Sequence, residues 1–120
     1  MEHSRSYRDL IDWKKSIALV GRIYSCTRSF PKEEIYGLTS QIRRAGISIP
    51  TNIAEGQARN NKGEFLQFLG IAQDSLAELE TLPLISQNLG YLTSTDAEGL
   101  LNDCEAIGKL LAGLKRSLIS

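Results

Sequence analysis

The chain has 120 residues, of which 42% are apolar, and its 14 basic side chains balance 14 acidic ones. This length and composition predict one globular domain over residues 1–120, with a core large enough to need no metal or disulfide. No run of about 18 apolar residues occurs, so no transmembrane helix is expected. The polar N-terminus does not resemble a secretory signal. We therefore expect a cytoplasmic protein, with residues 1–8 as a mobile tail.

The charges are divided unevenly along the chain. Residues 1–60 carry ten basic and six acidic side chains, whereas residues 61–120 carry four and eight. Blocks of one sign commonly do no more than solvate a surface. They are also compatible with a basic half that meets the acidic half of a neighbour, or with a basic face offered to nucleic acid.

The first predicted helix covers about residues 9–29 and has two apolar sets. One set recurs every three or four residues, which is typical of a helix face buried in a core; it consists of Leu10, Trp13, Ile17, Val20 and Tyr24. Leu19, Ile23 and Cys26 fall on a different side. Because a helix in a monomeric bundle needs only one buried stripe, contact with another subunit is the expected cover for the second set.

The second predicted helix covers about residues 31–58, with Pro31 as its first residue. Its apolar stripe continues through Pro50 without a change of phase, which predicts one helix kinked at that proline. The stripe consists of Ile35, Leu38, Ile42, Ala45, Ile49 and Ile53.

Two further helices follow. Asn61 and Glu64 form a capping pattern that opens the third, Pro83 lies inside it as a kink or an end, and Gly90 is its expected stop. A capping box over residues 95–98 opens the fourth. Their stripes are Phe65, Phe68, Leu69, Ala72, Leu76 and Leu79, then Leu100, Cys104, Ile107, Leu111, Leu114 and Leu118. Four amphipathic helices with short connections predict an all-α, up-down-up-down four-helix bundle.

Groups that support catalysis are scarce. The single histidine, His3, lies in the predicted tail, and no Glu-x-x-His pair exists for a di-metal bundle. Cys26 and Cys104 have no metal-spaced partner; a disulfide between them is possible, but two reduced thiols are the preferred interpretation. We expect no metal, no cofactor and no enzymatic activity.

The second helix also carries a polar strip beside its apolar stripe. Gln41, Ser48, Asn52 and Glu55 fall together on this strip. One interpretation is a structural network that fixes helix register; the other is a phosphate-binding surface formed by Arg43, Arg44 and Arg59. Tyr36 and Ile47 lie on the flank away from the core and, with Leu19 and Ile23, form the candidate oligomer interface.

Nearly the whole chain resembles one family. The similarity lies in Trp13, in Phe30-Pro31 with Glu34-x-Tyr36-Gly-Leu38, in Gln41-Ile-Arg-Arg-Ala45, in Ser48-Ile-Pro50-x-Asn-Ile-Ala-Glu-Gly56, and in Glu64-Phe65 with Leu69-x-Ile-Ala72-x-x-Ser75-x-x-Glu78-Leu79-Glu80. These motifs resemble the four-helix-bundle family of bacterial 23S rRNA intervening-sequence proteins, which includes the accessory variability proteins of diversity-generating retroelements.

The resemblance implies a left-handed bundle that assembles into a ring-shaped homopentamer. It also implies a reverse transcriptase and RNA or DNA as partners in the retroelement branch, with Arg43 and Arg44 as the matching contacts. This chain departs from that branch in its neutral charge, and Pro83 interrupts an aliphatic run. The leading hypothesis is thus a non-enzymatic homo-oligomeric scaffold; the alternative is a nucleic-acid-binding accessory protein.

Overall fold

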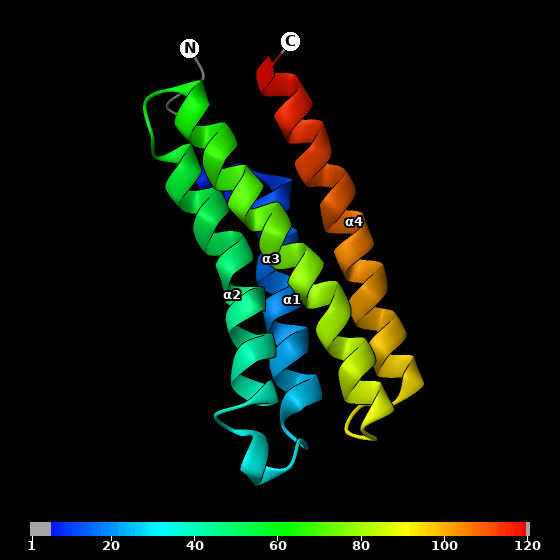
Figure 1. The fold of residues 1–120 in the computed structure, drawn as a ribbon. Coiled ribbons are helices and arrows are strands. Elements are labelled where there is room, and N and C mark those ends of the chain that lie inside the picture. Colours follow the sequence, from blue (N-terminus) through cyan, green and yellow to red (C-terminus); the bar gives the residue numbers. More distant parts are fainter. Residues whose placement is uncertain (1–5, 120) are drawn as a thin grey trace.

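The computed structural model describes residues 6–119, and within them the predicted all-α fold with four long helices and no strand is confirmed. These helices are α1 (Ile11–Thr27), α2 (Leu38–Gln57), α3 (Lys62–Asn88) and α4 (Ser94–Ile119), with short 3-10 helices η2 (Tyr7–Asp9) and η3 (Lys32–Glu34). Consecutive long helices run in opposite directions, so the start of α1 and the end of α4 lie toward the same end of the molecule (Figure 1).

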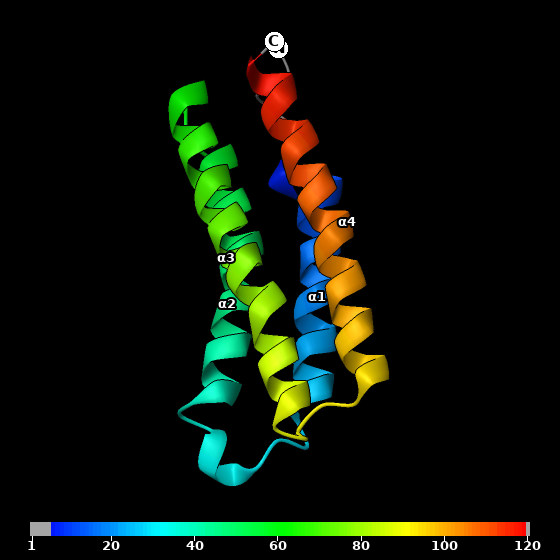
Figure 2. The same cartoon turned by 45° about the vertical axis from the view of Figure 1, so that its right-hand side comes forward.

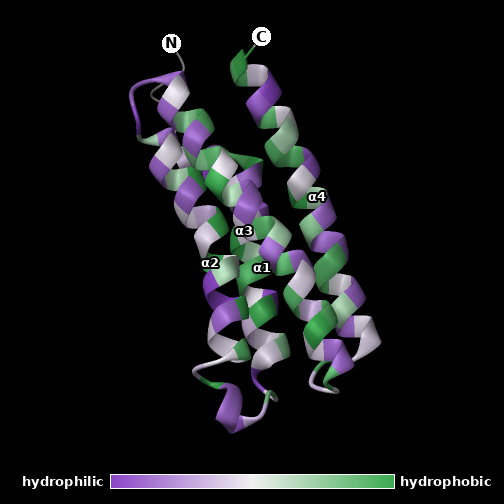
Figure 3. Ribbon diagram, in the orientation of Figure 1, coloured by the Kyte–Doolittle hydropathy of each residue, from purple (hydrophilic) through white to green (hydrophobic). Residues whose placement is uncertain are grey.

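Each long helix packs against two others. α2 contacts α1 and α3, and α4 contacts the same two helices from the other side. Figure 2 shows α2 grouped with α3, and α1 with α4. Apolar and polar segments alternate along every helix in Figure 3, as one buried stripe per helix requires. The predicted stripes of α3 and α4 supply buried Leu69, Leu79, Leu100 and Leu111. No helix within residues 6–119 is long and apolar enough to cross a membrane.

α1 buries the side that the sequence assigns to a subunit contact. Leu19 and Ile23 are within the core, whereas Ile17 and Tyr24 are 44% and 37% exposed. The prediction is therefore wrong for Leu19 and Ile23 and for Ile17 and Tyr24, although Leu10 and Trp13 of the predicted stripe do pack against the core. The core side of α1 also carries Ser16, whose hydroxyl donates to the Trp13 carbonyl oxygen at 2.9 Å. Such internal bonding lets a polar residue enter the core at little cost.

α2 begins later than predicted but continues through its proline. Pro31 precedes η3, and the helix starts only at Leu38, whose backbone N–H donates to the Glu34 carboxylate at 3.0 Å. Ile35 consequently lies outside the helix and is 48% exposed, against the prediction that it belongs to the core stripe. The prediction of one helix through Pro50 is confirmed.

Local capping interactions set both ends of α3 and the start of α4. The Asn61 side chain accepts a bond from the Glu64 backbone N–H at 2.7 Å, as predicted. α3 contains Pro83 and continues to Asn88, and Gly90 then adopts a positive φ of 81°. α4 opens two residues earlier than its predicted box, because the Thr93 hydroxyl, and not that of Thr95, accepts the Asp96 N–H at 3.1 Å.

The N-terminal region and the cysteines complete the fold. Within the predicted tail over residues 1–8, Tyr7 and Arg8 belong to η2, which places the Tyr7 ring 5.3 Å from that of Trp13. Residues 1–5, and His3 among them, lie outside the described residues. Cys26 and Cys104 are free thiols, so the preferred interpretation is confirmed. Burial raises the pKa of Cys104 to about 12, which keeps it an unreactive thiol.

Candidate functional site

A polar groove runs along the seam between α2 and α3, and we call it the α2–α3 groove. Its volume is about 470 Å³, and the polar side chains that line it are Ser40, Gln41, Arg44, Ser48, Ser75 and Glu78. Three of these come from the predicted polar strip or its border. The sequence thus locates one wall of this groove, while α3 supplies the other.

Hydrogen bonds cross the α2–α3 groove. Ser75 donates its hydroxyl to the Ser48 hydroxyl at 2.7 Å, and Gln41 donates its amide to the Glu78 carboxylate at 3.3 Å. Asn52 donates to the carbonyl and hydroxyl oxygens of Ser48 at 2.7 and 2.9 Å. These contacts bring Gln41, Ser48 and Asn52 together as a connection between α2 and α3.

Glu55 does not join this connection. It is exposed and lies beside a second groove, between α1 and α2. Glu55 also forms no ion pair with Arg44 or Arg59, because the ion pairs formed within residues 6–119 join Arg22 to Asp103 and Lys109 to Glu105.

The second groove, which we call the α1–α2 groove, is apolar. Its volume is about 410 Å³, and its walls include Trp13, Ile17, Val20, Ile47, Pro50 and Ala54. Ile17 and Ile47 are each more than 40% exposed there, and the partly exposed Tyr24 lies one helical turn beyond Val20. An isolated exposed apolar residue is ordinary, but a cluster on two neighbouring helices is a candidate contact surface.

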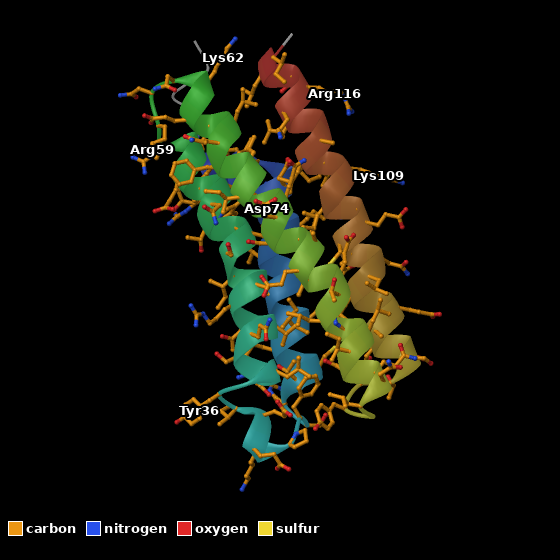
Figure 4. The ribbon with its side chains drawn as sticks, viewed as in Figure 1. Tyr36, Arg59, Lys62, Asp74, Lys109 and Arg116 are labelled. Atoms are coloured by element: carbon orange, nitrogen blue, oxygen red, sulfur yellow. The ribbon has the colours of Figure 1, made fainter. Side chains whose placement is uncertain are left out.

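The three candidate arginines separate in space. Arg43 faces α1, where its Nε donates to the Thr27 hydroxyl at 2.9 Å and its guanidinium lies 4.3 Å from the Tyr24 ring. Arg44 is exposed and lines the α2–α3 groove. Arg59 lies over the Phe68 ring at 4.8 Å, at the end of α2 far from Tyr36 (Figure 4). The structure therefore does not gather these arginines into one phosphate-binding surface.

The candidate interface residues fall into a buried pair and an exposed pair. Leu19 and Ile23 are buried within the single chain, so they cannot meet a second subunit in this fold, and that part of the prediction is wrong. Ile47 is exposed in the α1–α2 groove, and Tyr36 is 95% exposed and projects from the bundle (Figure 4). The sequence misses Ile17 and Tyr24 as surface residues because their spacing also fits a core stripe.

The basic and acidic side chains are distributed unevenly over the helices. α1 and α2 together carry five basic and two acidic side chains, whereas α3 carries four acidic side chains and one basic. Residues 6–119 contain no group of three or more histidine, cysteine, aspartate or glutamate side chains placed to hold a metal ion.

Comparison with known proteins identifies the chain's relatives. The sequence profile of the 23S rRNA-intervening sequence protein family matches residues 8–113. One similar crystal structure is that of a protein of unknown function from the S23 ribosomal protein family of Bacteroides thetaiotaomicron. It is 26% identical, with a TM-score of 0.81 over 97% of this chain and 99% of that one. No curated protein matches significantly. By the extent of the profile match, the chain belongs to the 23S rRNA-intervening sequence protein family.

Proposed function

We propose that this chain is a non-enzymatic scaffold that assembles head to tail into a closed homo-oligomeric ring. The observation that carries the proposal is the apolar cluster around the α1–α2 groove. Ile17, Tyr24 and Ile47 are exposed there on two neighbouring helices, with Val20 between them. Burying such a side chain contributes roughly 1.5–3 kcal/mol when its whole surface leaves water, so partial burial of several supports a stable contact.

The exposed side of α3 has the properties of a complementary surface. Ile71, Leu84 and Ile85 are 42–51% exposed along it. α3 also carries Asp74, Glu78 and Glu80, with no basic residue after Lys62. An apolar surface with acidic neighbours suits the apolar groove of the more basic α1–α2 pair.

A contact between two different surfaces has a consequence for assembly. It leaves one α1–α2 groove and one α3 surface open at the ends of any dimer, so growth continues until the ring closes. The family resemblance implies five copies in such a ring. A ring of this kind offers a repeated surface on which other molecules can be arranged, which is the basis of the scaffold role.

The test is the mass of the purified chain in solution. Multi-angle light scattering at micromolar concentration is expected to give an oligomer for the natural chain and a monomer for the Ile17→Glu/Ile47→Glu variant, because two buried carboxylates in the contact are strongly unfavourable. Ile119→Glu is the matched control: Ile119 is 70% exposed at the end of α4 and lines neither groove. It is expected to leave the mass unchanged.

A monomeric natural chain contradicts the proposal, as does a double variant that keeps the oligomer mass. Nucleic-acid binding is the rival function. It predicts RNA or DNA binding that weakens steeply with added salt and weakens further in Arg44→Gln. Such binding by a chain that remains monomeric favours the rival over the scaffold.

A further inference from the structure

A third cavity is lined by residues from the end of α1, from η3 and from the start of α2. Figure 1 shows that these segments meet at one end of the bundle. We call it the η3 pocket. Its volume is about 340 Å³, roughly ten times the share of one water molecule in the liquid. Phe30, Pro31 and Ile35 form apolar walls, and the polar side chains that line it include Arg28, Lys32 and Arg43.

The η3 pocket is lined by cations and by no carboxylate. Glu34 on η3 directs one carboxylate oxygen to the Leu38 backbone N–H and accepts the Tyr91 hydroxyl on the other. Neither ion pair within the described chain uses the pocket's three cations. An anion that enters the pocket therefore meets unneutralised positive charge.

Arg43 is held in position for such an anion. Its Nε donates to Thr27, whose hydroxyl in turn donates to the Ile23 carbonyl oxygen at 2.8 Å. The Tyr24 ring covers one guanidinium face. This arrangement occupies Nε and leaves the two terminal amino groups without a partner in residues 6–119. A guanidinium fixed in this way loses little freedom when it binds an oxyanion through two parallel bonds.

Thr39 provides a second, independent indication of a ligand. It lines the η3 pocket in the first turn of α2, it is 3% exposed, and its Oγ1 has no hydrogen-bond partner in the described structure. A buried hydroxyl without a partner is unfavourable, so such groups in native folds usually meet a ligand or water. The positive end of α2 adds to the attraction for an anion at this position.

We infer that the η3 pocket binds a small organic phosphate. Arg43 and Lys32 would contact the phosphate oxygens, Thr39 would donate its hydroxyl, and the apolar walls would hold an aromatic or aliphatic body. A phosphate monoester fits better than a carboxylate because its charge and three terminal oxygens match several donors at once. This site shares no lining residue with the α1–α2 groove, although Tyr24 borders both, and it does not depend on self-assembly.

The experiment is calorimetric titration of the full chain with three probes: inorganic phosphate, phenyl phosphate and benzoate. Phenyl phosphate is expected to bind most tightly, because it alone uses both the cations and the apolar walls. Arg43→Gln is expected to weaken it by about tenfold or more, as loss of a charge-assisted contact predicts. Arg44→Gln is the matched control, because Arg44 is the next residue but lines the α2–α3 groove; its affinity should equal that of the natural chain.

Thr39→Val separates binding from folding. The substitution removes the unpartnered hydroxyl and keeps the side-chain shape, so it should raise Tm while it weakens phenyl phosphate binding several-fold. This combination cannot arise from a loss of fold, so the variant decides the question even if Arg43→Gln is unstable. Benzoate that binds more tightly than phenyl phosphate overturns the inference, as does the absence of phenyl phosphate binding at millimolar concentration. Equal affinities in Thr39→Val and the natural chain overturn it as well.

Discussion

The two sides of α2 differ in how far their side chains find partners within the chain. Toward α3, polar side chains pair across the seam, as Ser48 does with Ser75 and Gln41 with Glu78. Toward α1, apolar side chains remain exposed, and the two buried polar atoms without a partner in residues 6–119, on Asp12 and Thr39, belong to α1 and α2. The polar groups of the α2–α3 seam are thus satisfied within one chain, whereas exposed apolar side chains and buried polar atoms without a partner remain on the α1–α2 side.

Two glycines of α2 test this difference, because Gly56 faces α3 and Gly46 faces α1. A methyl group at Gly56 would lie 2.8 Å from the Phe65 ring and 2.9 Å from the Phe68 Cβ, which is fixed to its backbone. At Gly46 the contact is the terminal methyl group of Ile23, at the flexible end of that side chain. Gly56→Ala should lower the free energy of unfolding by on the order of 1–2 kcal/mol, after the helix preference of alanine offsets part of the overpacking.

Urea denaturation of both glycine variants gives the measurement. Gly46→Ala is the matched control, and its free energy of unfolding should stay within about 0.5 kcal/mol of the natural value, because Ile23 can turn its end group and alanine favours the helix. A larger loss for Gly46→Ala than for Gly56→Ala would show that the α1 side, and not the α3 side, is the tightly fitted one.

Substitution of Asp12, whose buried carboxyl has an oxygen without a partner, tests whether unpaired polar groups on the α1 side cost stability. Burial raises the pKa of Asp12 above its ordinary 3.8, and its own backbone N–H partly opposes this effect. The folded state therefore holds the proton more tightly than the unfolded state, and stability falls as pH rises from 3.8 through the raised pKa. Asp12→Asn should stabilise the fold at pH 7 by on the order of 0.5–1 kcal/mol, because loss of a favourable charge at the start of α1 offsets part of the gain.

The pH dependence of that gain is the decisive measurement. Thermal unfolding at several pH values should show that the advantage of Asp12→Asn disappears as pH falls to 3.8 and below, where the natural carboxyl is also neutral. Asp9→Asn, at an exposed position in η2, serves as the control. An advantage that stays constant down to acid pH would mean that ionisation of Asp12 is not its cause.

Most of the fold could be predicted from the sequence because three of the four helices bury one clear apolar stripe. The helix α1 was also predicted, but its buried side was not, since that side includes Asp12, Ser16 and Thr27. The two hydroxyls bond to carbonyl oxygens of the preceding turn, so they are polar in composition but satisfied in the core. The more apolar set of α1 therefore lies nearer the surface. Counting the hydrophobic residues on each side of the helix does not predict this arrangement.

The candidate sites were predictable only in part for a related reason. Helical spacing correctly puts Gln41, Ser48 and Asn52 on one side of α2, but it contains no information on what α3 offers opposite them. Arg43 and Arg44 are neighbours in sequence, yet 100° of helix rotation sends one to Tyr24 and the other to the α2–α3 groove. The η3 pocket depends on the turn between α1 and α2, where periodicity carries no signal.

The smallest expected effect concerns the hydrogen bond that joins α2 to α3 at the centre of the seam. Ser75→Ala removes the donor to Ser48, but Ser48 keeps its bond from Asn52 and the groove admits water to replace the loss. We expect the free energy of unfolding to fall by about 0.5 kcal/mol, at the low end for one hydrogen bond. Ser40→Ala is the control, because Ser40 lines the same groove without a side-chain bond in the described chain. If both variants unfold at the same urea concentration as the natural chain, the polar pairing sets only the register of α2 against α3, and apolar packing alone makes that side stable.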